Sequence, residues 1–278
     1  MPAVHDTGTT TAPAASVHIG AITQAVTSMR RHLDEPHRLH DIARASLMSP
    51  FHFHRVFRML TAVTPGRFLT AVRMAEAKRR LLRSDASATD ISMAVGYSSF
   101  GTFTTQFTRL VGVSPGRFRT YGRAVADVPL RELVSTRPAR PARQPFALLH
   151  VGARPDGHPG LTVVATFRSG IPQQRPSSCA AILSPGVFPL PLDVAGKAGV
   201  LAVSARTDVT IGEVLTEEPS AGICVGSAEI PDEPVATQAT VAAGIPLRRP
   251  ALLDPPLLLA FPLLMIESQA GPRRAQVR

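Results

Sequence analysis

The side chains best suited to chemistry lie in two short stretches, residues 50–57 and 99–107. In each stretch two phenylalanines stand four residues apart, a spacing that places both on one face of a helix. A buried phenylalanine stripe leaves the neighbouring side chains near the outer faces of that helix. These outer residues are Phe51, His52, His54, Arg55 and Arg58 for the first stretch, and Phe100, Gly101, Thr104, Thr105 and Thr108 for the second. Most of them carry groups that donate or accept hydrogen bonds, which is the chemistry of recognition.

The two stretches belong to an internal repeat. Phe103 follows Phe53 by 50 residues, and both copies end in Ser/Thr-Pro-Gly-Arg-Phe, at residues 64–68 and 114–118. A short helical segment and a turn precede each copy, which predicts two helix–turn–helix units. Two such units, close together and basic, indicate a protein that reads DNA with two helices.

The distribution of charge supports the same interpretation. The 278-residue chain has a formal net charge of +10, and residues 20–125 contain 16 Lys/Arg against 6 Asp/Glu, so they carry the whole excess. Such a concentration is typical of a domain that binds a polyanion. On charge alone, an ordinary solvated basic face is the alternative.

Helix caps divide this basic region into elements. Ser16 is expected to cap the first helix, and residues 39–47 are expected to form a short helix with both end leucines facing inward. Three later caps stand directly before a proline, which is favoured at the first helical position. The later caps are Ser49, Thr64, Ser87, Ser98 or Ser99, and Ser114.

The helix that begins at Thr64-Pro65 is expected to run to Arg83 and to be about 30 Å long. That length could hold two subdomains roughly one DNA turn apart. The basic side chains on this helix should contact phosphate groups or acidic partners. They are Lys78, Arg79, Arg80 and Arg83.

Three motifs together resemble the DNA-binding domain of the AraC/XylS family of bacterial transcription regulators. They are residues 90–97 (DISMAVGY), the phenylalanine pair at 103 and 107, and residues 112–119 (GVSPGRFR). The family pattern is I-A-x-x-x-G-[FY], then F-x-x-x-F and G-x-[ST]-P. Ser92 stands where the family usually has alanine, and Ala62 replaces the more usual glycine before Val63. The resemblance covers a little over a third of the chain, residues 20–123.

This resemblance implies an all-α DNA-binding domain of seven helices over residues 16–125, in two helix–turn–helix subdomains joined by the long helix. It also implies that the outer residues of two recognition helices enter successive major-groove segments. Arg55 is the strongest candidate for reading a base, because a guanidinium can bind guanine O6 and N7 together. The short Thr105 stands where the family often has a long polar side chain, which weakens direct readout by the second helix. The predicted DNA-binding residues are Phe51, His52, His54, Arg55, Arg58, Lys78, Arg79, Phe100, Gly101, Thr104 and Thr105.

The second half of the chain differs in composition. Residues 126–278 hold 20 of the 26 prolines, so few long helices are expected there. Residues 126–145 are expected to be an Arg/Pro-rich linker, followed by a mainly-β domain over residues 146–266, in the form of a β-sandwich. The expected strands are residues 146–151, 161–167, 179–183, 199–205 and 221–225, with 237–242 and 257–265 as further candidates.

The order of these strands loosely resembles prealbumin-like sandwiches. The runner-up is an α+β effector-binding domain, for which the sequence offers no convincing long helix. At the two ends, residues 1–15 are expected to be a disordered tail and residues 267–278 a basic tail.

The two cysteines do not indicate a catalytic or metal site. Cys179 and Cys224 lack a CxxC partner and a histidine at metal-ligand spacing, so we expect no metal and no cofactor. Small buried hydrophobic residues are the favoured interpretation of both. His150 and His158 have no evident partner, and the cluster of glutamates at 213, 217 and 218 is expected to be an acidic surface loop.

No targeting segment is evident. The N-terminus lacks a basic start and an apolar core, and the most apolar run, residues 251–266, contains Asp254 and three prolines. We therefore expect a soluble, cytoplasmic protein that does not enter a membrane.

The leading functional hypothesis is a sequence-specific transcription regulator that binds double-stranded DNA and is not an enzyme. RNA polymerase, a second copy of the chain and a small-molecule effector are the further partners considered. A DNA-repair enzyme with an alkyl-accepting cysteine is one competing hypothesis, but it requires a base or cation beside the thiol. An architectural DNA-binding protein with little sequence preference is the other.

Overall fold

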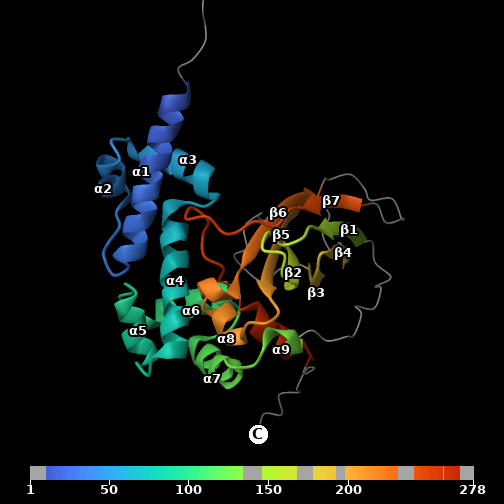
Figure 1. Ribbon diagram of the computed structural model, residues 1–278. Helices are drawn as coiled ribbons and strands as arrows, with labels where there is room; N and C mark the ends of the chain where they lie inside the picture. The colour runs from blue at the N-terminus through green and yellow to red at the C-terminus, as the bar shows by residue number, and fades with distance from the viewer. Residues whose placement is uncertain are drawn as a thin grey trace, which may run out of the picture. The chain divides into compact units, whose positions relative to one another are not determined.

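The computed structural model describes residues 11–133, 146–167, 178–191, 198–230, 241–258 and 260–269 (Figure 1). The chain divides into two compact units, and the boundary between them falls inside helix α4 (Pro65–Arg83). The first unit extends to Val72 and includes the short segment Ala251–Pro255. The second contains Arg73–Pro250 and the residues from Pro256 onward.

The first unit is helical. Its core combines apolar side chains of its longest helix, among them Ile22, Val26 and Met29, with phenylalanine rings. The rings of Phe57 and Phe68 meet edge to face, 5.6 Å apart. Arg30 donates hydrogen bonds to carbonyls of the returning segment 251–255. The helices are α1 (Thr11–Arg31), α2 (Leu39–Ala45), α3 (Pro50–Thr61) and the first part of α4.

Two predictions for this unit are wrong in detail. Helix α1 begins at Thr11, before the expected cap at Ser16, because Pro13 lies in the first turn, where its missing N–H costs nothing. Helix α2 ends at Ala45, and neither end leucine faces inward as expected, because Leu39 is exposed and Leu47 is 96% exposed at φ 53°. The first ten residues of the expected N-terminal tail lie outside the described residues.

The second unit contains the other helix–turn–helix copy. Its helices start as expected, because the hydroxyls of Ser87, Ser99 and Ser114 each accept a hydrogen bond from the backbone N–H three residues later. The rings of Phe103 and Phe107 are fully buried, and Phe118 packs on Phe107. These elements are the second part of α4, α5 (Ala88–Ala94), α6 (Phe100–Val111), α7 (Pro115–Val125) and the 3-10 helix η1 (Leu130–Leu133).

The helices α3 and α6, which correspond in the two copies, end differently. Gly112 follows α6 at φ 95°, whereas Ala62 occupies the matching left-handed position after α3 at φ 61°. A left-handed conformation costs a non-glycine residue roughly 1–2 kcal/mol, and glycine avoids most of that cost.

We therefore expect Ala62→Gly to stabilise the chain by about 0.5–1 kcal/mol, after the larger conformational entropy of unfolded glycine is subtracted. Gly112→Ala should destabilise it by a similar amount. Urea unfolding followed by circular dichroism measures both, and a loss of stability in Ala62→Gly would contradict the argument.

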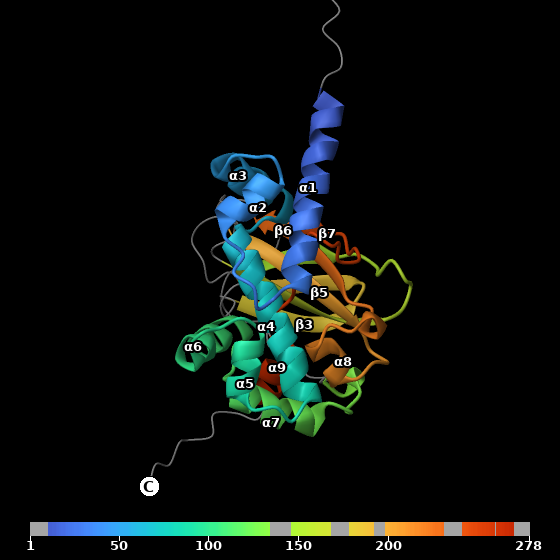
Figure 2. The same ribbon diagram turned by 90° about the vertical axis from the view of Figure 1, so that its left-hand side faces the viewer.

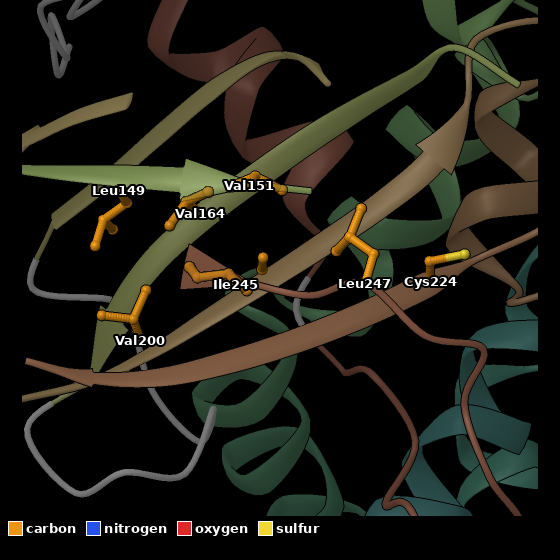
Figure 3. Packing of buried hydrophobic residues seen from close by; sticks show 8 residues of the cluster. Leu149, Val151, Val164, Val200, Cys224, Ile245 and Leu247 are labelled. Carbon is orange, nitrogen blue, oxygen red and sulfur yellow. The ribbon is translucent and has the colours of Figure 1, made fainter. Parts of the chain in front are cut away.

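The second unit also contains two β-sheets. One has the strand order β4-β1-β7 and the other β3-β2-β5-β6, and all pairs are antiparallel except β1 with β7. Side chains of both sheets share one buried cluster, to which Leu149, Val164, Val200 and Ile245 contribute (Figure 3). The strands are β1 (Phe146–Val151), β2 (Gly160–Phe167), β3 (Ser178–Ser184), β4 (Gly186–Pro191), β5 (Ala198–Arg206), β6 (Cys224–Ile230) and β7 (Val241–Ile245).

Several elements of the second half differ from expectation. Strand β4 was not among the expected strands, and its edge position tolerates its two prolines. Helix α8 (Ile211–Leu215) was also not predicted, although Thr210 and Glu213 form a capping box at its start. The expected strand 221–225 begins only at Cys224, after the 3-10 helix η2 (Pro219–Ala221).

The strand expected over residues 257–265 is wrong as well. Helix α9 (Phe261–Gln269) occupies its second half, with Pro262 in the first turn. Among the described helices none is both long enough and apolar enough to span a bilayer.

Candidate DNA interface

The predicted polar residues of α3 lie at its surface. Phe51 is 82% exposed, so its ring lies outside the core. Arg55 and Arg58 are exposed, and His52 and His54 are partly buried. Phe53, Val56 and Phe57 form the buried face of the same helix.

A chain of hydrogen bonds connects Arg55 to α1. Arg55 Nη2 lies 3.4 Å from His52 Nδ1, and His52 Nε2 lies 3.4 Å from His18 Nε2. A guanidinium can only donate, so His52 Nδ1 accepts in this contact and the ring proton that faces His18 is on Nε2. His52 then donates to His18. No motif marks His18, because only the packing of α1 against α3 brings the two rings together.

Helix α6 presents a less polar face than α3. Gly101, Thr105 and Thr108 are exposed, whereas Thr104 is partly buried and its Oγ1 has no hydrogen-bond partner within the described part of the chain. Phe100 is 40% exposed and stacks on Phe103, with the ring centroids 6.3 Å apart.

Lys78 is not available to DNA, which corrects the prediction for this residue. Its side chain is 2% exposed, and its Nζ donates to the carbonyl of Leu257 at 2.8 Å and lies 3.5 Å from Glu217 Oε1. Arg79 is 45% exposed and pairs with Glu76 on the same helix, so it stays at the surface.

Other basic residues of the second unit also have structural partners. Arg119 donates to the carbonyls of Leu81 and Ala86, and Arg123 donates to the carbonyl of Leu82, at the C-terminal end of α4 and just beyond it. Cations at a helix C-terminus donate hydrogen bonds to the last carbonyls and interact favourably with the negative end of the helix dipole. Part of the positive charge counted from the sequence therefore stabilises the helical fold.

Residues 42–121 match the helix-turn-helix domain family. The probable transcription factor PqrA of Proteus vulgaris is 33% identical over 85 residues, which are 31% of this chain and 70% of PqrA. The HTH-type transcriptional regulator Rv1931c of Mycobacterium tuberculosis is 34% identical over 83 residues, which are 30% of this chain and 32% of that protein.

Among solved structures, the DNA-binding domain of AdpA in complex with a target DNA is 31% identical, with a TM-score of 0.36, and the match covers 37% of this chain and 94% of that one. The chain spans only about a third of the length of Rv1931c and of the Bacillus subtilis regulator YbfP. The match to PqrA, in contrast, extends over most of that protein. The chain therefore belongs to the AraC-type helix-turn-helix family of transcription regulators.

Proposed function

We propose that this protein binds DNA with sequence specificity and regulates transcription, inserting α3 and α6 into successive major-groove segments. The observation that carries the proposal is the repeated arrangement itself. In each unit a serine-capped helix buries two phenylalanines and exposes the opposite face. A regulator of this kind acts where the chromosome is, which places the proposed function in the cytoplasm.

Selection of binding sites from random duplexes tests this function. The affinity of the full chain for the selected site and for unrelated DNA is then measured at several salt concentrations, with labelled DNA because the chain has no tryptophan. We expect a selected site to bind at least about 1000-fold more tightly than unrelated DNA. Equal affinity for both would favour the architectural alternative.

Arg55 is proposed to read a base. Arg55→Ala should cost about 1–3 kcal/mol on the selected site and relax the preference at one base pair. Arg58→Ala is the matched comparison, because a phosphate contact would weaken binding to all sequences and reduce the salt slope by about one. If Arg55→Ala weakens binding to random DNA by the same factor as binding to the selected site, then Arg55 contacts phosphate.

For the mainly-β second half we propose the role of a ligand-sensing or self-associating domain, built as a β-sandwich over residues 146–266. The buried cluster shared by the two sheets supports an independent core. Sedimentation of the full chain across a range of concentrations tests self-association. Binding to RNA polymerase is a further proposal, tested by transcription from a promoter that carries the selected site.

The repair-enzyme alternative finds no support in the thiols. Such an enzyme needs a cysteine with a lowered pKa. Cys224 is buried, but Cys179 is exposed, which corrects the expectation that both cysteines are buried. Partial desolvation raises the pKa of Cys179, and burial is the main cause of the raised pKa of Cys224. Both thiols are therefore poor nucleophiles in this structure.

A further inference from the structure

A buried lysine connects helix α4 to the second half of the chain. Lysine is almost never fully buried without a partner, and both partners of Lys78, Glu217 and Leu257, come from beyond residue 200. Burial lowers the pKa of the Lys78 amine, while the Glu217 carboxylate acts in the opposite direction. The enclosed ammonium thus depends on a carboxylate and a carbonyl that the β-containing half supplies.

Glu217 contacts Leu257 as well as Lys78, so the three residues are mutually connected. Glu217 Oε2 accepts a hydrogen bond from the N–H of Leu257 at 3.1 Å, while Leu257 accepts from Lys78 through its carbonyl. Further along α4, Arg83 forms an ion pair with Glu218. The acidic residues that the sequence suggested as a surface loop therefore face the basic side of α4.

Close backbone packing continues the same contact. A Cβ on Gly212 of α8 would lie 3.0 Å from the carbonyl oxygen of Ala126, directly after α7. Beyond α7, the N–H of Leu130 donates to Val209 at 2.7 Å. Helices α8 and α9 both contact α7, as Figure 2 shows. This packing leaves little freedom between the second helix–turn–helix copy and the β-containing half.

We propose that Lys78, Glu217 and Leu257 form a latch through which the C-terminal domain holds the second DNA-binding subdomain in a single arrangement. That subdomain consists of α4 from Arg73 onward with α5, α6 and α7. The latch couples the proposed second recognition helix to whatever the C-terminal domain binds.

The physical reason lies in the cost of an unpaired buried charge. A small displacement leaves the ammonium without its acceptors, which costs more than losing an apolar contact of the same size. Complete undocking returns Lys78 to water and removes that cost. The second subdomain is therefore either docked on the C-terminal domain or fully undocked from it, and partly displaced arrangements are unstable. Whatever factor a ligand of the C-terminal domain imposes on DNA binding through this contact, DNA imposes the same factor on the binding of that ligand.

Hydrogen exchange of the full chain without DNA tests the latch. In Glu217→Gln we expect the amides of α7 and of α4 after Arg73 to exchange about tenfold faster, together with those of α8, while the amides of α3 keep their rates. Glu76→Gln is the matched control. It removes a carboxylate of α4 that pairs with Arg79 and Arg80, both of which are partly exposed. Its rates should stay within about twofold of wild type.

The combined variant Lys78→Met with Glu217→Gln separates the latch from general damage. Removing the buried charge should restore most of the lost protection. The proposal is overturned if the exchange rates of α4 and α7 are unchanged in Glu217→Gln, or if the amides of α3 exchange faster by the same factor. It is also overturned if adding Lys78→Met to Glu217→Gln lowers the protection further.

A DNA footprint extends the test and rests on the proposed function. The half-site read by α3 is identified as the one whose base preference changes in Arg55→Ala. In Glu217→Gln, protection of the other half-site should require about tenfold more protein than in the wild type. Equal weakening of both half-sites would overturn the coupling to α6. If the wild-type chain selects no site at all, the proposed function fails, and hydrogen exchange alone then decides on the latch.

Discussion

Replacing Glu217 by alanine is expected to lower the free energy of unfolding of the second unit by about 3 kcal/mol. The substitution leaves the ammonium of Lys78, which is 2% exposed, with the carbonyl of Leu257 as its remaining acceptor. Lys78→Met should cost less than about 1 kcal/mol, since an apolar side chain of similar length fills the same space and Glu217 is partly open to water. The loss of stability is thus expected to be much larger when the carboxylate of this ion pair is removed than when the lysine is replaced.

Urea unfolding of the full chain, followed by circular dichroism, measures both changes. The double variant Lys78→Met with Glu217→Ala should be nearly as stable as Lys78→Met alone, because no buried charge remains to be compensated. Glu76→Ala serves as the exposed comparison and should change stability by less than about 1 kcal/mol. Equal losses for Glu217→Ala and Lys78→Met would show that packing, and not the buried charge, accounts for the contact.

Phe57→Ala is expected to destabilise the first unit by about 3–5 kcal/mol. The ring is fully buried, with Phe53 at 5.7 Å and Phe68 at 5.6 Å between centroids, so its removal leaves a cavity and deletes two aromatic contacts. Thermal unfolding of the full chain measures the loss.

Phe51→Ala provides the matched control, since it removes the same side chain from the same helix. Because Phe51 is 82% exposed, its removal should change stability by less than about 0.5 kcal/mol. It should instead weaken binding to the selected DNA, where we propose that this ring contacts the duplex. A large loss of stability in Phe51→Ala, or a small one in Phe57→Ala, would contradict the assignment of the two faces of α3.

Local patterns were sufficient where neighbouring residues decide the conformation. The serine caps and the proline after Ser49 and Ser114 predict the starts of α3 and α7, because a cap hydroxyl bonds an N–H three residues away. The phenylalanine pairs predict the buried faces of α3 and α6 for the same reason. The family assignment rests on these motifs, and the comparisons confirm it.

Local patterns misled where the partner is remote in the chain. Lys78 looks like a phosphate contact when counted with its basic neighbours, but residues 139 and 179 positions later enclose it. His18 carries no motif, and only the packing of α1 makes it a neighbour of His52. Residues 257–265 were interpreted as a candidate strand, whereas α9 starts at Phe261 with Pro262 in its first turn, where proline is tolerated.

The sequence by itself therefore determined the repeat, the helix starts, the buried phenylalanine faces and the family, since caps, turns and helical spacing act over a few residues. The tertiary structure alone decided which charges stay at the surface and which are buried. The burial of Lys78 against Glu217 follows from contacts between segments far apart in the chain, and no local pattern encodes the loss of water around an ammonium group.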